Sequence, residues 1–403
     1  MLQILEGIRL IEVADWGFVP SAATVLGDWG ADIIKIEHPV RGDPMRGLVT
    51  SGLVPGAHGV NFFVEHLSRN KRSIGVDLNQ PAGRDILYRL VDTADIFLTN
   101  FLPAARRRLG ITYEDLRQRN PRIIYAKGHG QGQKGPDAER GGYDGCSFWA
   151  RGGIADRLTR PGQPLVQQRA AFGDFTGGMF LAGGIAGALY HRERSGEGLE
   201  VDVSLLGNAV WIMAPDIVAA MTYGFELPQS GLGGTPNPLV NTYWSSDGKG
   251  IVLMMLQSER FWPIFTAAVG RADILADSRF DTPEKRQGEG AALAEQLAAL
   301  FATRTRADWA ALLNASECIW APLQSPAEIP DDPQVVENGY VMGFDHPAHG
   351  QFRVTASPVQ FGNEAPTVRR AASELGADTE AVLLELGYTW EEIAQHKESG
   401  AIC

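Results

Sequence analysis

Short runs rich in β-branched residues alternate with helical stretches over the first two hundred residues of this 403-residue chain. Such a rhythm is typical of parallel strands joined by crossover helices, so the expected fold class is α/β. The expected strands cover residues 8–13, 32–37, 73–78, 95–100, 122–127 and 199–205. The expected helices between them begin near Pro20, Pro81 and Thr112.

Composition narrows the class of protein. The chain carries 36 basic and 48 acidic residues, a net charge of −12, and it has no block of five or more basic residues. Neither feature fits duplex nucleic acid as a partner. The three cysteines are far apart and include no CxxC motif, so they imply neither a disulfide framework nor a thiolate zinc site, and no signal peptide is recognisable at the N-terminus. We therefore expect a cytoplasmic protein.

A boundary signal follows residue 225, where glycines and prolines crowd into one loop. These residues are Gly231, Gly233, Gly234, Pro236 and Pro238. A second cluster of prolines, between Pro322 and Pro333, has the spacing of a return linker. The sequence therefore divides into residues 1–225, 226–330 and 331–403.

Residues 171–190 are mostly apolar and hold one charge, Asp174. With Gly183 and Gly187 spaced four apart, the segment could be a membrane helix with a small-residue packing face. An aspartate inside such a span costs about 2.5 to 3.5 kcal/mol, which favours a soluble helix packed tightly against a sheet and no membrane partner. Several glycines in one helix indicate a close approach of backbones.

Asp174 itself has two interpretations. It could be an N-cap aspartate at the start of this helix. It could instead be a carboxylate on a glycine-flanked turn, with the backbone N–H groups of Gly177 and Gly178 free to face a reacting centre. Spacing alone does not decide between them.

Two other motifs carry weaker signals. The glycine run at residues 128–132 follows a strand but matches no dinucleotide or P-loop pattern, so a flexible strand-end loop is expected. Asp345-His346-x-x-His349 offers ligand-like side chains without a third ligand in sight. We interpret it as a solvated loop and expect no metal site.

A series of short segments, taken in order, identifies the chain more specifically. These segments are residues 5–12, 30–37, 42–46, 70–74, 100–103, 141–144, 173–179, 277–280, 321–322 and 377–402. Each is a weak motif alone, but their order over about 400 residues resembles the family III CoA-transferases, also called the CaiB/BaiF family. The resemblance implies a Rossmann-like large domain with a parallel sheet, a smaller α/β domain, and an interlocked homodimer. Residues 1–225 and 331–403 would form the large, CoA-binding domain.

The resemblance also implies a chemistry. The protein would be an acyl-CoA:carboxylate CoA-transferase in which Asp174 is the nucleophile, forming a mixed anhydride and then an aspartyl-CoA thioester. Its partners would be an acyl-CoA and a carboxylic acid acceptor. Coenzyme A would enter as part of the substrate, with no tightly bound cofactor.

By matching positions, the resemblance assigns a set of CoA contacts. They are Trp16, Gly17, His38, Val76, Asp77, Leu78, Asn79, Asn100, Phe101, Arg108, Gly142, Tyr143 and Asp144. Arg108 is the expected phosphate partner, although a solvated cationic face at residues 106–108 is the alternative. The Gly231–Gly234 loop, including Gly233 and Gly234, matches a mobile loop that shields the intermediate from water.

Two departures from the family pattern leave alternatives open. Racemases of the superfamily place a histidine where Tyr143 stands, and tyrosine is a poor base at neutral pH. This favours transfer over a 2-methylacyl-CoA racemase or epimerase, although His129 could substitute as a base. Gly17 stands where some members carry a glutamine. A CoA-ester binding protein without chemistry is the third alternative.

Overall fold

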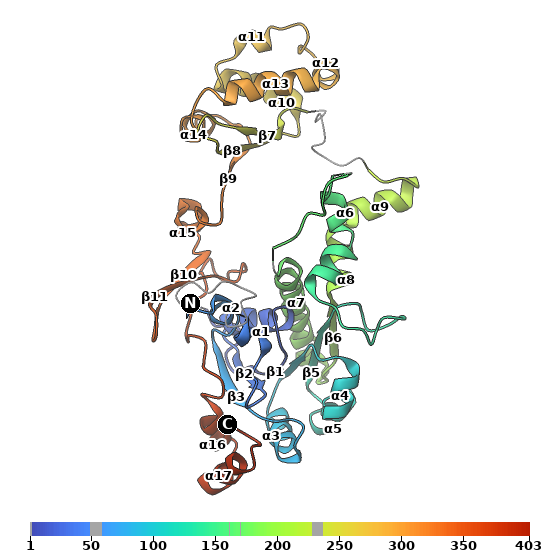
Figure 1. Cartoon of the computed structure of the whole chain (residues 1–403), viewed down its shortest axis with the longest axis vertical. Helices are drawn as coiled ribbons and strands as arrows, with labels where there is room; N and C mark the ends of the chain where they lie inside the picture. Colours follow the sequence, from blue (N-terminus) through green and yellow to red (C-terminus); the bar gives the residue numbers. More distant parts are fainter. Residues whose placement is uncertain (1, 49–58, 161, 170, 228–236) are drawn as a thin grey trace. The chain divides into compact units, whose positions relative to one another are not determined.

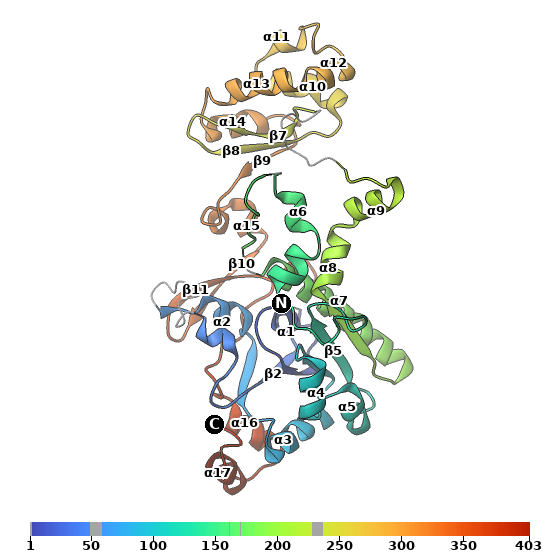
Figure 2. The same cartoon turned by 45° about the vertical axis from the view of Figure 1, so that its right-hand side comes forward.

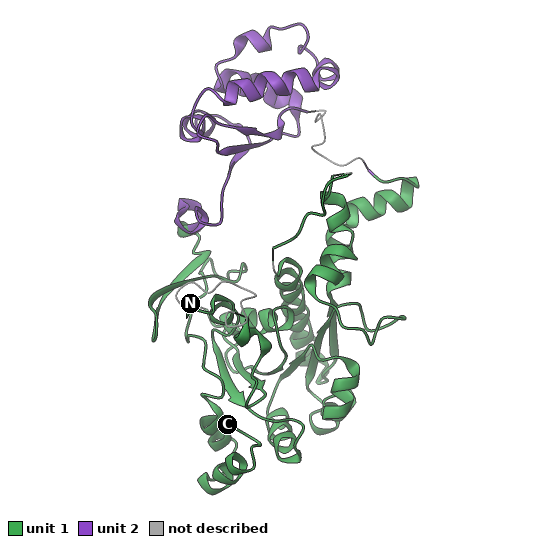
Figure 3. Cartoon of the chain, in the orientation of Figure 1, with its two compact units in different colours: residues 1–226, 336–403 green, residues 227–335 purple. Residues whose placement is uncertain are grey.

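The computed structural model describes residues 2–48, 59–160, 162–169, 171–227 and 237–403. The chain forms two compact units (Figure 3). The first contains residues 1–226 and 336–403, and the second contains residues 227–335. The expected glycine-loop residues Gly231, Gly233 and Gly234 lie outside the described residues.

A six-stranded sheet is the centre of the first unit (Figure 1). Its strands are β1 (Arg9–Val13), β2 (Asp32–Glu37), β3 (Lys71–Gly75), β4 (Ile96–Thr99), β5 (Ile124–His129) and β6 (Glu200–Ser204). All neighbouring strands are parallel, in the order β3-β2-β1-β4-β5-β6. The expected α/β fold with a parallel sheet is therefore confirmed. The strand order reverses between β1 and β4, the place where open α/β sheets bind ligands at the carboxyl ends of their strands.

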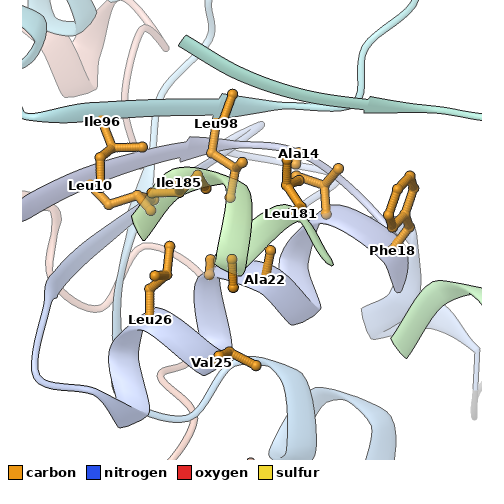
Figure 4. Packing of buried hydrophobic residues seen from close by; sticks show 14 of the residues in the cluster. Leu10, Ala14, Phe18, Ala22, Val25, Leu26, Ile96, Leu98, Leu181 and Ile185 are labelled. Atoms are coloured by element: carbon orange, nitrogen blue, oxygen red, sulfur yellow. The ribbon is translucent and has the colours of Figure 1, made fainter. Parts of the chain in front are cut away.

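Helices α1 (Phe18–Asp28) and α7 (Phe172–Ser195) cover one face of this sheet. Figure 4 shows Leu181 and Ile185 of α7 packed between α1 and the strands. The glycines of α7 permit this contact, because a Cβ on Gly178 would collide with Ser21 Oγ of α1. The apolar segment at 171–190 is thus part of a core helix, as its glycines indicated.

The other face is covered by helices from both ends of the chain. They are α3 (Pro81–Asp92), α4 (Pro103–Leu109), α5 (Tyr113–Arg119), α16 (Thr379–Glu385) and α17 (Trp390–Glu398). Helices α16 and α17 lie beside α3 (Figures 1 and 2). The C-terminus is fixed there as well, since the amide of Asp77 donates to the carbonyl of Ala401 at 2.9 Å.

The third strand is shorter than expected. We predicted residues 73–78, whereas β3 runs from Lys71 to Gly75. Its register pairs Gly75 with Glu37, the last residue of β2, so the ladder ends where its partner ends. Beyond it, the Asp77 carboxylate accepts from the amide of Asn79 at 3.0 Å and turns the chain.

The second unit contains a three-stranded antiparallel sheet with helices packed on it. The sheet consists of β7 (Val240–Trp244), β8 (Gly250–Met254) and β9 (Trp320–Leu323). The helices are α10 (Ser258–Ala268), α11 (Ala272–Leu275), α12 (Pro283–Gly288), α13 (Gly290–Phe301) and α14 (Arg306–Asn314). Phe265, Phe301 and Trp309 fill a core of this unit's own.

Shorter elements complete the chain. They are η1 (Pro44–Gly47), α2 (Phe62–Leu67), η3 (Gly145–Ala150), α6 (Ile154–Leu158), α8 (Leu205–Ile212), α9 (Ala214–Tyr223), η4 (Ile329–Asp331), α15 (Pro333–Glu337), β10 (Val341–His346) and β11 (Gly350–Thr355). Among the described residues, no single helix has the length and hydropathy to cross a membrane, while α8 and α9, bent by 69°, meet that test only as a pair.

Candidate active site

A cavity of about 540 Å³ lies at the carboxyl ends of the central strands. Asp15 and Trp16 line it after β1, and Asn100 and Phe101 line it after β4. These two strands flank the reversal of strand order. The cavity therefore occupies the position at which a doubly wound sheet is expected to hold a ligand.

Asp174 lines this cavity from the first turn of α7. The N-cap residue of α7 is Ala171, so the interpretation of Asp174 as the N-cap is wrong. The start of α7 is capped instead by the carboxylate of Asp144, whose Oδ1 accepts a hydrogen bond from the backbone amide of Gly173 at 3.1 Å. Because Asp144 takes over the capping, the side chain of Asp174 is left to face the cavity.

The electrostatic environment of Asp174 suits a nucleophile. Burial, and then the charge of Asp144, raise the pKa of the Asp174 carboxyl from 3.8 to about 7. Burial also raises the pKa of Asp144. Within the described part of the chain, Asp144 Oδ2 is buried without a hydrogen-bond partner. A carboxylate that titrates near neutral pH is more basic than an ordinary aspartate, and such shifts are typical of functional sites.

Gly17 leaves room for the Asp174 carboxyl. A Cβ at Gly17 would come within 2.6 Å of Asp174 Oδ2. The φ of Gly17 is −96°, which alanine adopts without strain. We expect Gly17→Ala to lower kcat about a hundredfold, because a displacement of about 1 Å misaligns a nucleophile.

The measurement for Gly17→Ala is steady-state kinetics beside thermal unfolding. The melting temperature should change little, since the three atoms nearest to the added methyl all belong to the side chain of Asp174. An unchanged kcat would show that the Asp174 carboxyl does not need its present position.

The residue before Gly17 is held in an unfavourable conformation. Trp16 has φ of 68°, which costs about 1 to 3 kcal/mol for a residue other than glycine. Its amide donates to Asp43 Oδ1 at 3.1 Å, and its ring meets Tyr143 edge to face at 5.8 Å. The Trp16 and Tyr143 rings thus form an aromatic pair on the wall of the cavity.

A buried ionic network fixes this loop from beneath. Lys35 Nζ donates to Glu12 Oε1 at 2.7 Å and to Asp43 Oδ2 at 2.9 Å. Lys71 Nζ donates to Glu12 Oε2 at 2.7 Å. Burial lowers the pKa of Lys71 to about 8, whereas the Asp43 and Glu12 carboxylates outweigh burial and raise the pKa of Lys35. The network joins β1, β2 and β3 to the loop that holds Trp16.

The structure brings most of the predicted contact residues to one cavity. Those that line it are Trp16, His38, Val76, Asp77, Leu78, Asn79, Asn100, Phe101, Arg108, Gly142 and Tyr143. Gly17 and Asp144 do not line it, and they lie instead against Asp174 and the start of α7.

Three charged residues of the cavity were missed by the sequence analysis. Asp15, Glu37 and Arg41 all line it. Asp15 lies two residues past the first expected strand and Glu37 is the last residue of the second, so their places at strand ends were the available signal. Arg41 lies in the turn after β2, and its amide donates to His38 Nδ1 at 3.3 Å. No local pattern distinguishes it from a surface arginine.

His129 lines the cavity but has no free nitrogen. Its Nε2 lies 2.6 Å from Asp202 Oδ2, and its Nδ1 accepts from the amide of Gly132 at 3.0 Å. Accepting at Nδ1 requires the proton to be on Nε2 in the neutral ring. Both nitrogens are therefore occupied, and the ring is not placed to remove a proton from a ligand.

The interpretation of Asp345-His346-x-x-His349 as a solvated loop is wrong for His346. This residue ends β10, is buried, and its Nε2 lies 3.0 Å from Glu65 Oε2 of α2. Together with His349 the two form a Glu-His-His cluster. His346 Nδ1 accepts from the amides of Ala348 and His349, so Nε2 carries the proton and donates to Glu65. This tautomer leaves no lone pair on His346 for a metal.

The fold and the cavity together define a doubly wound α/β protein with a half-buried carboxyl group of raised pKa facing a ligand-sized cleft. The family follows from comparison with known proteins. The model of CoA-transferase family III matches residues 5–379, and the chain belongs to this family. It is therefore an enzyme of the family III CoA-transferase type.

Named relatives cover the whole chain. The chain is 31% identical over 400 residues to (R)-2-hydroxy-4-methylpentanoate CoA-transferase of Clostridioides difficile, covering 99% of each. It is 31% identical to cinnamoyl-CoA:phenyllactate CoA-transferase of Clostridium sporogenes, covering 97% of this chain and 95% of the relative. The crystal structure of a CaiB/BaiF family protein from Brucella suis is similar, with a TM-score of 0.82 and 27% identity, covering 96% of this chain and 100% of that one.

Proposed function

We propose that the protein is an acyl-CoA:carboxylate CoA-transferase that works through Asp174. The observation that carries the proposal is the placement of this carboxyl group. It lines the cavity at the strand-order reversal, and Asp144 caps α7 in its place. Membership in a family of CoA-transferases makes CoA thioesters the substrates.

The transfer proceeds in balanced steps. An Asp174 oxygen attacks the thioester carbonyl, the C–S bond breaks, and CoA leaves as a thiolate, so that an aspartyl mixed anhydride remains. The thiolate then attacks the Asp174 carbonyl and expels the first acid as its carboxylate, which gives an aspartyl-CoA thioester. An incoming carboxylate reverses the two steps and leaves as the new acyl-CoA. An anhydride preserves the acyl activation that an ordinary ester would lose.

Two arginines and a histidine that line the cavity suit the phosphate groups of CoA. Of the run at residues 106–108, only Arg108 lines the cavity, while Arg107 pairs with Glu139 at the surface. Arg41 and His38 line the same cavity. We assign these three side chains to the phosphates, because guanidinium groups bind phosphate in a forked geometry, whereas the carboxyl groups that line the cavity would repel it. The other CoA contacts are proposed as the family resemblance assigns them.

The geometry disfavours the racemase alternative. Moving an α-proton requires a base and an acid at the substrate. His129 is held by Asp202 and Gly132 through its two nitrogens, and the side chain of Tyr143 is largely exposed. His129 is therefore not free to pair with Asp174 in moving an α-proton.

An exposed apolar surface supports the proposal of a homodimer. Helices α8 and α9 expose several large side chains, among them Trp211 at 71% and Met221 at 74%. A surface of this kind marks an interface. We propose that a second copy of this chain covers this surface. The proposed location of the protein is the cytoplasm. Light scattering of the purified protein should give twice the chain mass of 43.7 kDa, and a monomer would contradict the dimer.

The test of function is a screen of acyl-CoA donors against carboxylic acids, read by product mass. The panel should include 2-hydroxy acids, since the names of two relatives contain them. Donor and hydroxylamine together, without an acid acceptor, should convert Asp174 to a hydroxamate. Exchange of the α-proton for deuterium without an acceptor, and no transfer with any pair, would favour the racemase. Binding of CoA without either reaction would favour a binding protein.

A further inference from the structure

A second carboxyl group, that of Asp15, lines the same cavity as Asp174. Its backbone is fixed by a reciprocal pair of hydrogen bonds with Asn100. The Asp15 amide donates to Asn100 Oδ1 at 3.1 Å, and Asn100 Nδ2 donates to the Asp15 carbonyl at 2.6 Å. These bonds tie the ends of β1 and β4, so Asp15 is held rigidly at the strand-order reversal.

The Asp15 carboxyl has no partner among the described residues. It forms no hydrogen bond there, and Lys35, whose charge acts on it, already donates to Glu12, Asp43 and the carbonyl of Ala14. An unpaired carboxyl group that lines a cavity is available to a ligand.

The charges around Asp15 are mostly negative. Glu12 on β1, Glu37 on β2 and Asp43 in the following loop oppose its ionisation, and Lys35 alone favours it. The other charged or titratable side chains that line the cavity are Asp77, His38, Arg41, Arg108, Tyr143, His129 and Asp174. Burial, and then the charge of Asp43, raise the pKa of Asp15 from 3.8 to about 7. The carboxyl group is therefore largely protonated below neutral pH.

We propose that Asp15 binds the substrate in its protonated form, donating its O–H to a carbonyl or carboxylate oxygen of the bound molecule. The proposal rests on the proposed function, since that function supplies the ligand. A protonated carboxyl donates one hydrogen bond, whereas the ionised form only accepts and would repel an oxygen at the same place. The acceptor oxygen has two sources: an amide carbonyl of the pantetheine arm of CoA, or the carboxylate of the acid acceptor.

The first arm of the test measures binding to Asp174→Asn protein, which removes the titration of Asp174. The probe is S-methyl-3′-dephospho-CoA, which lacks both the thiol and the phosphate that titrates near pH 6. With Asp15 present, affinity measured by calorimetry should fall about tenfold from pH 6 to pH 8, because the protonated fraction falls by that factor. With Asp15→Asn added, affinity should change less than twofold, since the amide keeps a donor at every pH.

Two controls isolate Asp15. Asp92→Asn makes the same chemical change at an exposed ion pair with Arg119 outside the cavity and should keep the tenfold fall. Thermal unfolding of each variant checks that it is folded. Any pH dependence that comes from other groups is present both with and without Asp15→Asn, so the difference between the two profiles reports Asp15.

The second arm measures KM for the acid acceptor in protein that retains Asp174. One outcome is that probe binding does not depend on pH, while KM for the acid rises about tenfold from pH 6 to pH 8 when Asp15 is present and does not rise when it is replaced. In that case the oxygen that accepts from Asp15 belongs to the acid acceptor. If Asp15→Asn leaves both profiles unchanged while the probe still binds, the proposal for Asp15 is overturned and the proposed function stands. If no variant binds the probe at pH 6, the proposed function itself is contradicted, and the proposal for Asp15 with it.

Discussion

Replacing Asp174 with asparagine is expected to abolish CoA transfer, with a loss in kcat of at least about a thousandfold. The amide is nearly isosteric with the carboxyl but is not a nucleophile, so neither the anhydride nor the aspartyl thioester can form. The measurement is transfer from an acyl-CoA to a labelled acid, with hydroxylamine trapping as a second readout. Asparagine at 174 should give no hydroxamate. Residual turnover within tenfold of the parent protein would place the nucleophile elsewhere.

The same substitution provides its own control for folding. The pKa of Asp174 is about 7 in the folded protein and 3.8 as an ordinary carboxyl, so the folded state holds the proton more tightly. The stability that this protonation contributes is fully present below pH 3.8 and is lost as pH rises through 7. Asp174→Asn should therefore be at least as stable as the parent at pH 8.

In the parent, kcat/KM should fall tenfold per pH unit as pH drops below 7, because the nucleophile becomes protonated.

Replacing Glu12 with glutamine is expected to lower the free energy of unfolding by about 3 to 5 kcal/mol. The two carboxylate oxygens of Glu12 each hold one buried ammonium group, Lys35 and Lys71, at 2.7 Å. Glu12 and its two partners are at most 3% exposed, so water cannot replace the lost charge. The substitution leaves more positive than negative charge in the core, and the loop that carries Trp16 loses part of its support.

Chemical denaturation at pH 7 measures this effect. The matched control is Glu385→Gln, which breaks the pair with Arg72 at a carboxylate whose side chain is 48% exposed. Exposed pairs contribute about 1 kcal/mol or less, so the control should change the free energy of unfolding little. Equal effects of the two substitutions would show that the Glu12 network does not stabilise the fold.

Local patterns predicted the architecture of the first unit well. The strand expected at residues 32–37 is β2, and Thr112 and Asp115 form the capping box that begins α5. Both features depend on residues within one or two turns of each other, which a sequence displays directly. The end of β3 was misplaced because it depends on the length of β2, which lies more than thirty residues away in the chain.

The sequence alone determined that a parallel α/β sheet forms, that a glycine-rich helix packs against it, and that Asp174 lies near the start of that helix. The role of Asp174 was decided by tertiary structure. Asp144, from a separate segment of the chain, caps the start of α7, and Gly17, the N-cap of α1, leaves space for the Asp174 carboxyl. The occupied nitrogens of His129, and the Asp15 carboxyl that has no partner among the described residues, were likewise decided there. Hydrogen bonding and desolvation depend on which groups are in contact in the folded protein, and local sequence spacing does not specify contacts between distant segments.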